Sequence, residues 1–93
     1  MDEALFKQLV WDYKMTSGEF VEILTGQKQN GWFNQDWAIS RVLENLNYYE
    51  AMSLVPFKTL ANRWESVKPR LFVQSIKDGY EFVLHRHALS VTG

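Results

Sequence analysis

The hydrophobic residues of this 93-residue chain recur at helical spacing, beginning close to the N-terminus. Residues on one face of a helix return every three to four positions, and aspartate is a common residue at helix starts. We therefore expect a first helix that begins after Asp2. Its apolar face consists of Leu5, Phe6, Leu9, Val10 and Tyr13.

The sharpest start signal lies in the stretch MTSGEF. Thr16 and Glu19 have the spacing of a capping box, in which each side chain bonds to the backbone N–H of the other residue. Met15 and Phe20 occupy the two positions of a hydrophobic staple. Because glycine adopts the left-handed conformation that ends many helices, we expect this second helix to stop at Gly26.

A turn and a third helix follow. Asn30-Gly31 is a strong turn signal, and Asn34 is a suitable cap. Trp37 falls inside this helix, where we expect it to join the core. The helix carries apolar residues at i, i+3, i+4 and i+7, the spacing of one buried stripe. These residues are Ile39, Val42, Leu43 and Leu46.

The next two helices carry their own start signals. Asn47 and Glu50 repeat the capping-box spacing before the short segment YYEAMSLV. Pro56 suits the first turn of a fifth helix, where its missing N–H is not needed. That helix has the same apolar spacing, in Phe57, Leu60, Ala61 and Trp64.

The last helix has two candidate starts. Pro69 interrupts the chain before it. Ser75 with Asp78, and Asp78 with Glu81, form two overlapping cap signatures. A start at Ser75 would place Gly79 inside the helix, where glycine costs about 1 kcal/mol relative to alanine. The alternative start at Asp78 therefore stays open.

No segment shows the alternating pattern of a strand, and the chain contains no repeat or linker. A chain of this length forms one domain. We expect an all-α fold, a compact single-domain bundle of five to seven short helices spanning residues 1–93.

Composition narrows the class of protein. Hydrophobic residues make up 46% of the chain and aromatic residues 15%, which is enough for a core, and the net charge is only −1. Cysteine is absent, which leaves neither disulfides nor thiolate ligands. The N-terminus lacks the pattern of a signal peptide, and no apolar run approaches the roughly 20 residues of a membrane span. We expect a cytoplasmic protein with no membrane association and no cofactor.

The sequence offers little for catalysis or metal binding. It contains no GxSxG elbow and no glycine-rich phosphate loop. The two histidines, His85 and His87, would point about 200° apart on a helix and could not chelate one ion. We therefore predict no catalytic residue, no metal site and a protein that is not an enzyme.

Charge leaves nucleic-acid binding open as an alternative. Residues 1–52 carry a net charge of −4, and residues 53–93 carry +3. Residues 47–68 have the outline of a helix-turn-helix-like pair, which a DNA-binding transcriptional regulator would use. The candidate contacts on its second helix are Lys58, Asn62, Arg63 and Lys68.

Three fragments carry a family resemblance: LVWDYKMTSGEFVEILTG, WAISRVLENLNYY and SIKDGYEFVLHR. In this order they resemble small bacterial antitoxin-like proteins encoded beside nucleotidyltransferase-type toxins. The resemblance implies a cognate toxin as partner and brings no catalytic residues with it. From spacing alone, Arg41 and Glu44 at i, i+3 predict a surface ion pair.

The leading interpretation is a small non-enzymatic protein-interaction domain. Its partner would be another protein, such as a cognate toxin, or a second copy of the chain. Aromatic residues dominate the energy of many interfaces. The interaction candidates are Trp32, Phe33, Tyr48 and Tyr49.

Overall fold

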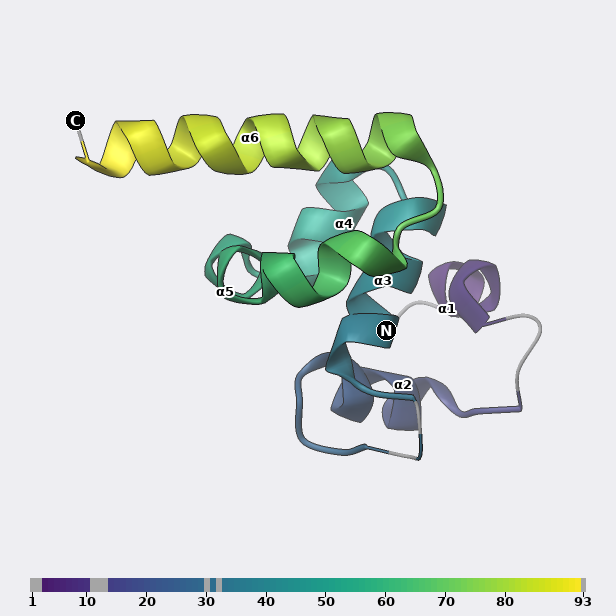
Figure 1. The fold of residues 1–93 in the computed structure, drawn as a ribbon. Helices are drawn as coiled ribbons and strands as arrows, with labels where there is room; N and C mark the ends of the chain where they lie inside the picture. The colour runs from purple at the N-terminus through teal and green to yellow at the C-terminus, as the bar shows by residue number, and fades with distance from the viewer. Residues whose placement is uncertain (1–2, 11–13, 30, 32, 93) are drawn as a thin grey trace.

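A computed structural model describes residues 3–10, 14–29, 31 and 33–92, with side chains described as far as Arg86. Within this part the chain is all-helical and contains no β-strand, as the sequence predicts (Figure 1). The elements are α1 (Glu3–Val10), α2 (Ser17–Leu24), α3 (Gln35–Asn45), α4 (Tyr48–Leu54), α5 (Phe57–Val67), the 3-10 turn η1 (Lys68–Arg70) and α6 (Gln74–Thr92).

Helix α3 is the centre of the bundle. It contacts α1, α2, α4, α5 and η1, and its residues from Asp36 to Ser40 are all buried. Trp37 packs edge-on against Phe20 of α2, with ring centroids 5.9 Å apart, which confirms its predicted core role. Because every other short helix rests on α3, its apolar surface organises the hydrophobic core.

Helix α2 begins and ends on local signals. The Thr16 side chain accepts a hydrogen bond of 3.1 Å from the Glu19 backbone N–H. The Glu19 carboxylate binds Lys28 at 2.7 Å. At the other end Gly26 has a φ of 80°, and the backbone N–H groups of Gly26 and Gln27 bond to the carbonyls of Ile23 and Glu22. This paired arrangement is a Schellman motif, so the predicted stop at Gly26 is confirmed.

The caps of α3 and α4 also follow the sequence. Asn34 accepts a bond of 3.0 Å from the Trp37 N–H at the start of α3. Asn47 and Glu50 form the complete capping box at the start of α4. Pro56 is the residue just before α5, and Pro69 lies in η1, where the chain leaves the α5 direction.

Helix α6 is capped from elsewhere in the fold. It begins at Gln74, one residue before the earlier of the two predicted starts, and Gly79 lies inside it. The Glu44 carboxylate of α3 accepts hydrogen bonds from the backbone N–H groups of Phe72 and Val73, at 2.7 and 3.1 Å. An acidic group 28 residues away thus does the work that we expected of Ser75 and Asp78.

The predicted ion pair between Arg41 and Glu44 within α3 is wrong, because each side chain binds a different segment. Arg41 Nε donates to the Leu9 carbonyl at 2.7 Å and so ties α1 to α3. Glu44 is engaged with the segment before α6. The two side chains therefore hold different neighbours of α3.

Beyond its first turn, α6 is attached to the rest of the bundle by three apolar side chains and one ion pair among the contacts described. Tyr80 is buried, while Ile76 and Leu84 are half-buried against the core. Glu81 forms an ion pair of 2.7 Å with Lys68, which lowers the pKa of the carboxyl group, and the indole N–H of Trp64 adds to this effect. The Trp64 nitrogen is buried, yet it does not reach hydrogen-bond geometry with any described group.

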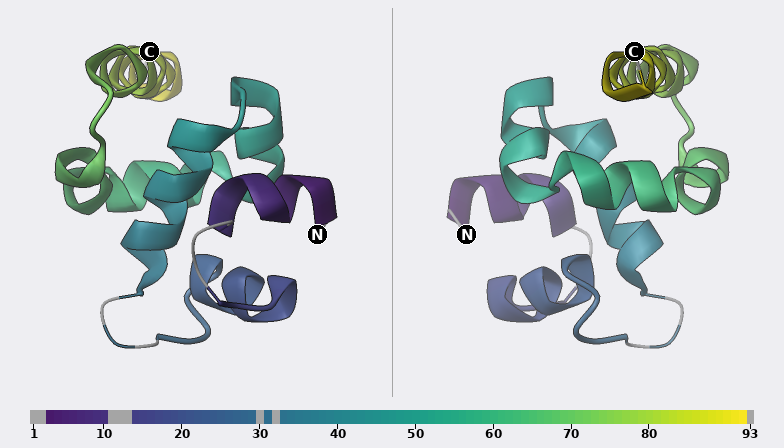
Figure 2. Two further views of the ribbon diagram at one scale, coloured as in Figure 1. Left: turned by 90° about the vertical axis from the view of Figure 1, so that its right-hand side faces the viewer. Right: turned by 90° about the vertical axis from the view of Figure 1, so that its left-hand side faces the viewer.

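The placement of α6 determines the shape of the molecule, which measures 44 × 23 × 23 Å along its principal axes. The C-terminal half of this helix extends past α5 in Figure 1. In both views of Figure 2, α6 is seen nearly end-on, and no other helix covers its outer side. None of the described helices is long and apolar enough to cross a membrane.

Replacing the distant cap tests its role. We expect Glu44→Ala to cost about 1 kcal/mol of unfolding free energy, the usual value of a helix cap. Hydrogen exchange should accelerate at the first hydrogen-bonded amide of α6, the Lys77 N–H that bonds to the Val73 carbonyl, because the preceding segment loses its acceptor. Glu22→Ala, an exposed carboxylate of α2, is the control. Equal exchange in both variants would contradict the cap.

Candidate interaction surface

An apolar groove of about 330 Å³ runs between the α3–α4 junction and α6. Its size falls at the lower end of ligand and side-chain binding pockets. The lining includes no carboxylate, imidazole or basic group. We call this site the tyrosine groove, and its lining residues are Leu43, Leu46, Tyr48, Ser75, Ile76, Gly79, Tyr80 and Val83.

Tyr48 lines the tyrosine groove, and Tyr49 adjoins it by packing against the Tyr48 ring. The Asn47 cap makes Tyr48 and Tyr49 the first two residues of α4. Their rings meet edge-on at 5.6 Å, and Tyr48 also lies 6.0 Å from the Tyr80 ring across the groove. Tyr48 is 42% exposed and Tyr49 is 83% exposed, so a partner could reach both rings.

Tyr80 forms the floor of the groove on the α6 side. The residue is only 7% exposed, and burial raises the pKa of its hydroxyl, with a further contribution from Tyr48. Among the described residues no group hydrogen-bonds to this hydroxyl, although buried tyrosines usually have such a partner. The hydroxyl is not among the fully buried polar atoms, so the groove combines apolar walls with one polar group that reaches solvent.

Gly79 lines the groove, and nothing within the chain requires a glycine at this position. Its φ is not positive, and a Cβ atom built there would meet no atom within 4 Å. An alanine would fit and would favour the helix by about 1 kcal/mol. Glycine leaves the surface of α6 open at this point.

The structure separates the four predicted interaction residues. Tyr48 and Tyr49 lie together at the groove. Phe33 packs against Trp37 with ring centroids 4.8 Å apart and is half-buried against the core, at the opposite end of α3. Trp32 lies outside the described residues. Phe33 is therefore part of the packing around α3, and the accessible aromatic pair is the one on α4.

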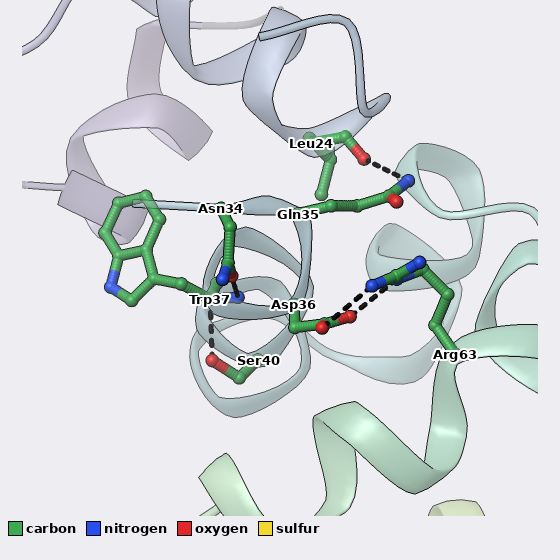
Figure 3. A network of polar contacts seen from close by, with 7 residues as sticks. All are labelled: Leu24, Asn34, Gln35, Asp36, Trp37, Ser40 and Arg63. Carbon is green, nitrogen blue, oxygen red and sulfur yellow. Dashed lines mark hydrogen bonds and ion pairs between the residues drawn. The ribbon is translucent and has the colours of Figure 1, made fainter. Parts of the chain in front are cut away.

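Two of the four nucleic-acid candidates already bind carboxylates. Arg63 donates two hydrogen bonds to Asp36, from Nε at 2.6 Å and from Nη2 at 2.9 Å (Figure 3). This contact raises the pKa of the guanidinium group. Lys68 is paired with Glu81. Lys58 and Asn62 are exposed on α5.

The Asp36–Arg63 pair belongs to a structural network at the start of α3. Figure 3 shows Gln35 reaching the Leu24 carbonyl of α2, at 3.2 Å, beside this pair. Ser40 donates to the Trp37 carbonyl at 2.7 Å. A polar pocket of about 430 Å³ adjoins the network, but its two cationic residues, Lys28 and Arg63, are both held by acidic partners. The network joins α2, α3 and α5.

Three exposed hydrophobic residues escaped the sequence analysis. Phe72 is 91% exposed and Val73 45%, in the segment that leads into α6, and Phe82 is 61% exposed on α6 itself. A helical projection would have identified Phe82, because it lies about 200° around the helix from the buried Tyr80. For Phe72 the sequence carries no periodic signal.

No group of three potential metal ligands occurs among the residues that the structure describes. His85 is exposed, and the side chain of His87 lies outside the described part. Comparisons with protein-family models, with curated proteins and with solved structures found no match to this chain. The antitoxin-like resemblance thus stays a prediction.

Removing Arg63 tests whether it is structural. Loss of one partner from a fully buried pair costs about 3–5 kcal/mol. Because the Arg63 side chain is 40% exposed, water compensates in part, and we expect Arg63→Met to cost about 2 kcal/mol in urea denaturation. Lys58→Met on the same helix should stay within about 0.5 kcal/mol of the parent protein. Equal effects would show that the Asp36 contact contributes little.

The raised pKa of Tyr80 predicts that the free energy of unfolding falls at alkaline pH. Its raised pKa favours the folded state below the ordinary tyrosine pKa of about 10. That contribution disappears as the pH rises through the higher pKa of the folded protein. We expect Tyr80→Phe to lose less unfolding free energy than the parent chain over this range, measured by urea denaturation at stepped pH. Tyr49→Phe should follow the parent; parallel loss in all three proteins would contradict the assignment.

Proposed function

We propose that this chain is a small non-enzymatic protein-interaction domain, and that it binds its partner through the tyrosine groove. The observation that carries the proposal is an exposed pair of tyrosines: Tyr48 lines an apolar groove, and Tyr49 packs against the Tyr48 ring. Tyrosine is enriched among the residues that dominate binding energy, because its rigid ring buries a large area and its hydroxyl remains able to hydrogen-bond.

The chemistry of the groove supports binding. Its walls offer aliphatic and aromatic surface to an apolar side chain, and the Tyr80 hydroxyl offers one directional contact. None of its lining residues carries a carboxylate, an imidazole or a thiol. The lining therefore suits recognition of a hydrophobic segment better than acid–base or nucleophilic chemistry.

The alternative of a DNA-binding regulator has less support from the same surface. A recognition helix needs cationic side chains that are free to meet phosphates or bases. Arg63 holds the buried Asp36, and Lys68 holds Glu81 on α6. Binding DNA through these residues would require breaking contacts that join α5 to α3 and η1 to α6.

A candidate partner follows from the family resemblance. The resemblance implies a toxin-type enzyme encoded by a neighbouring gene. We propose that this enzyme is the partner that binds the tyrosine groove. An amphipathic helix of the partner would present one apolar side chain to the groove, with the rings of Tyr48 and Tyr49 closing over it.

Truncating the exposed ring tests the proposal. We expect Tyr49→Ala to weaken binding of the neighbouring gene product at least tenfold, a change of about 1.4 kcal/mol. Stability should stay unchanged, because the ring is 83% exposed. Isothermal titration of the two purified proteins measures the affinity.

Phe72→Ala provides the matched control, since Phe72 is a comparably exposed aromatic residue that neither lines the groove nor packs against the Tyr48 ring as Tyr49 does. It should bind like the parent chain. Absence of any complex with the parent chain would contradict the proposed partner. An equal loss in both variants would contradict the groove as the binding surface.

A further inference from the structure

The inner part of α6 carries an unexplained glycine and, about one turn later on the same face, an exposed phenylalanine whose ring lies under the Arg86 guanidinium group, 5.7 Å away. Gly79 has open space where its side chain would be, and no backbone constraint requires glycine there. Phe82, three residues later, is 61% exposed. Within one chain the Phe82 ring cannot fill the space over Gly79, because both residues lie on the same helix face. The ring of one molecule could fill the space over Gly79 of another.

Both residues belong to one helical stripe. Ser75, Gly79, Phe82 and Arg86 are spaced four, three and four residues apart, and all four are exposed. At 100° per residue they fall within an arc of roughly 60°. This spacing is typical of a surface that packs against a second helix. We call these four residues the α6 seam.

We propose that a second copy of this chain docks on the α6 seam, with its own α6 running antiparallel across a twofold axis. The ring of Phe82 from each copy then fills the space over Gly79 of the other, at the edge of the tyrosine groove. This inference rests on the proposed role of that groove as a protein-binding surface. The contact is isologous, since each copy gives Phe82 and receives it.

Charge selects the antiparallel direction. Asp78 lies toward the N-terminal end of the seam and Arg86 toward the C-terminal end, and both side chains are exposed. Antiparallel pairing about a centre between Gly79 and Phe82 places Arg86 of one copy opposite Ser75 of the other, about one helical turn from Asp78. Parallel pairing would place like charges together at both ends. The outer side of α6 is free for this approach, as Figure 2 shows.

Glycine at position 79 is what permits the close approach. Small residues let two helix backbones come near enough for a large side chain opposite to be buried. Val83 and the walls of the groove continue the apolar surface on one side, and the exposed Tyr49 extends it on α4. A single chain gains nothing from the gap at Gly79, whereas a pair of chains fills it twice.

Sedimentation equilibrium of the full chain tests the pairing. The mass should rise from 11.0 kDa toward twice that value as protein concentration increases. Gly79→Leu should weaken association at least tenfold, because leucine occupies the space that Phe82 needs. The variant should also melt at a higher temperature as a monomer, since leucine favours helix over glycine. Weaker association therefore could not be attributed to unfolding.

Gly18→Leu is the matched control. Gly18 lies in α2, where a Cβ also meets no atom within 4 Å, and it is remote from the seam in sequence and element. It should associate like the parent chain, while Phe82→Ala should behave like Gly79→Leu. A chain that stays at 11.0 kDa up to its solubility limit overturns the proposal. So does a dimer that neither seam variant weakens.

Direction is tested by crosslinking, because the natural chain contains no cysteine. Ser75→Cys and Arg86→Cys proteins are mixed and oxidised. Antiparallel pairing predicts that the disulfide between the two different variants dominates. Dominant Ser75→Cys homodimers would indicate parallel helices and overturn the proposed geometry.

The outcomes separate this inference from the proposed function. If the chain is monomeric and still binds the neighbouring gene product through Tyr49, self-pairing is ruled out and the proposed function stands. A dimer broken by Gly79→Leu, together with no binding of that gene product, supports self-pairing and removes the proposed partner.

Discussion

The Glu44 carboxylate decides where α6 begins, and the interaction surface depends on that choice. By accepting the N–H groups of Phe72 and Val73, it satisfies donors that a helix start leaves open and fixes the direction in which the chain departs from η1. One wall of the tyrosine groove is α6 and the other is the α3–α4 junction, only two residues beyond Glu44. A single side chain thus links the end of the core helix to the geometry of the surface.

The polar contacts of this small domain divide into two kinds. Asp36 with Arg63, and Arg41 with the Leu9 carbonyl, join helices around the buried face of α3, where apolar packing already holds them. Glu44 and the Lys68–Glu81 pair hold α6, whose apolar contribution to the core is small. The first kind reinforces helix positions that apolar packing determines, and the second kind adds to the packing of Tyr80, Ile76 and Leu84 in placing α6.

Sequence reasoning succeeded wherever the signal was local. Thr16, Asn34 and Asn47 each directly precede a helix and accept a hydrogen bond from the backbone N–H three residues later, so spacing alone identified these starts. It failed where partners are distant in sequence, because nothing near Glu44 indicates that it caps a helix 28 residues away. The groove was missed for the same reason: Tyr48 was identified as an interaction residue, but its opposite wall, Tyr80, comes from a helix 32 positions later in the chain.

The exposed Lys68–Glu81 pair has a consequence for how the surface responds to its medium. Both side chains are open to solvent, at 38% and 50%, so dissolved ions screen their attraction, while the apolar contacts around α3 are not weakened in this way. Ionic strength therefore acts unequally on the two ends of the molecule. Added salt weakens this one contact of α6 and leaves the packing of α2 against α3 in place, so the attachment of α6 is the part of the fold that depends more on the solution.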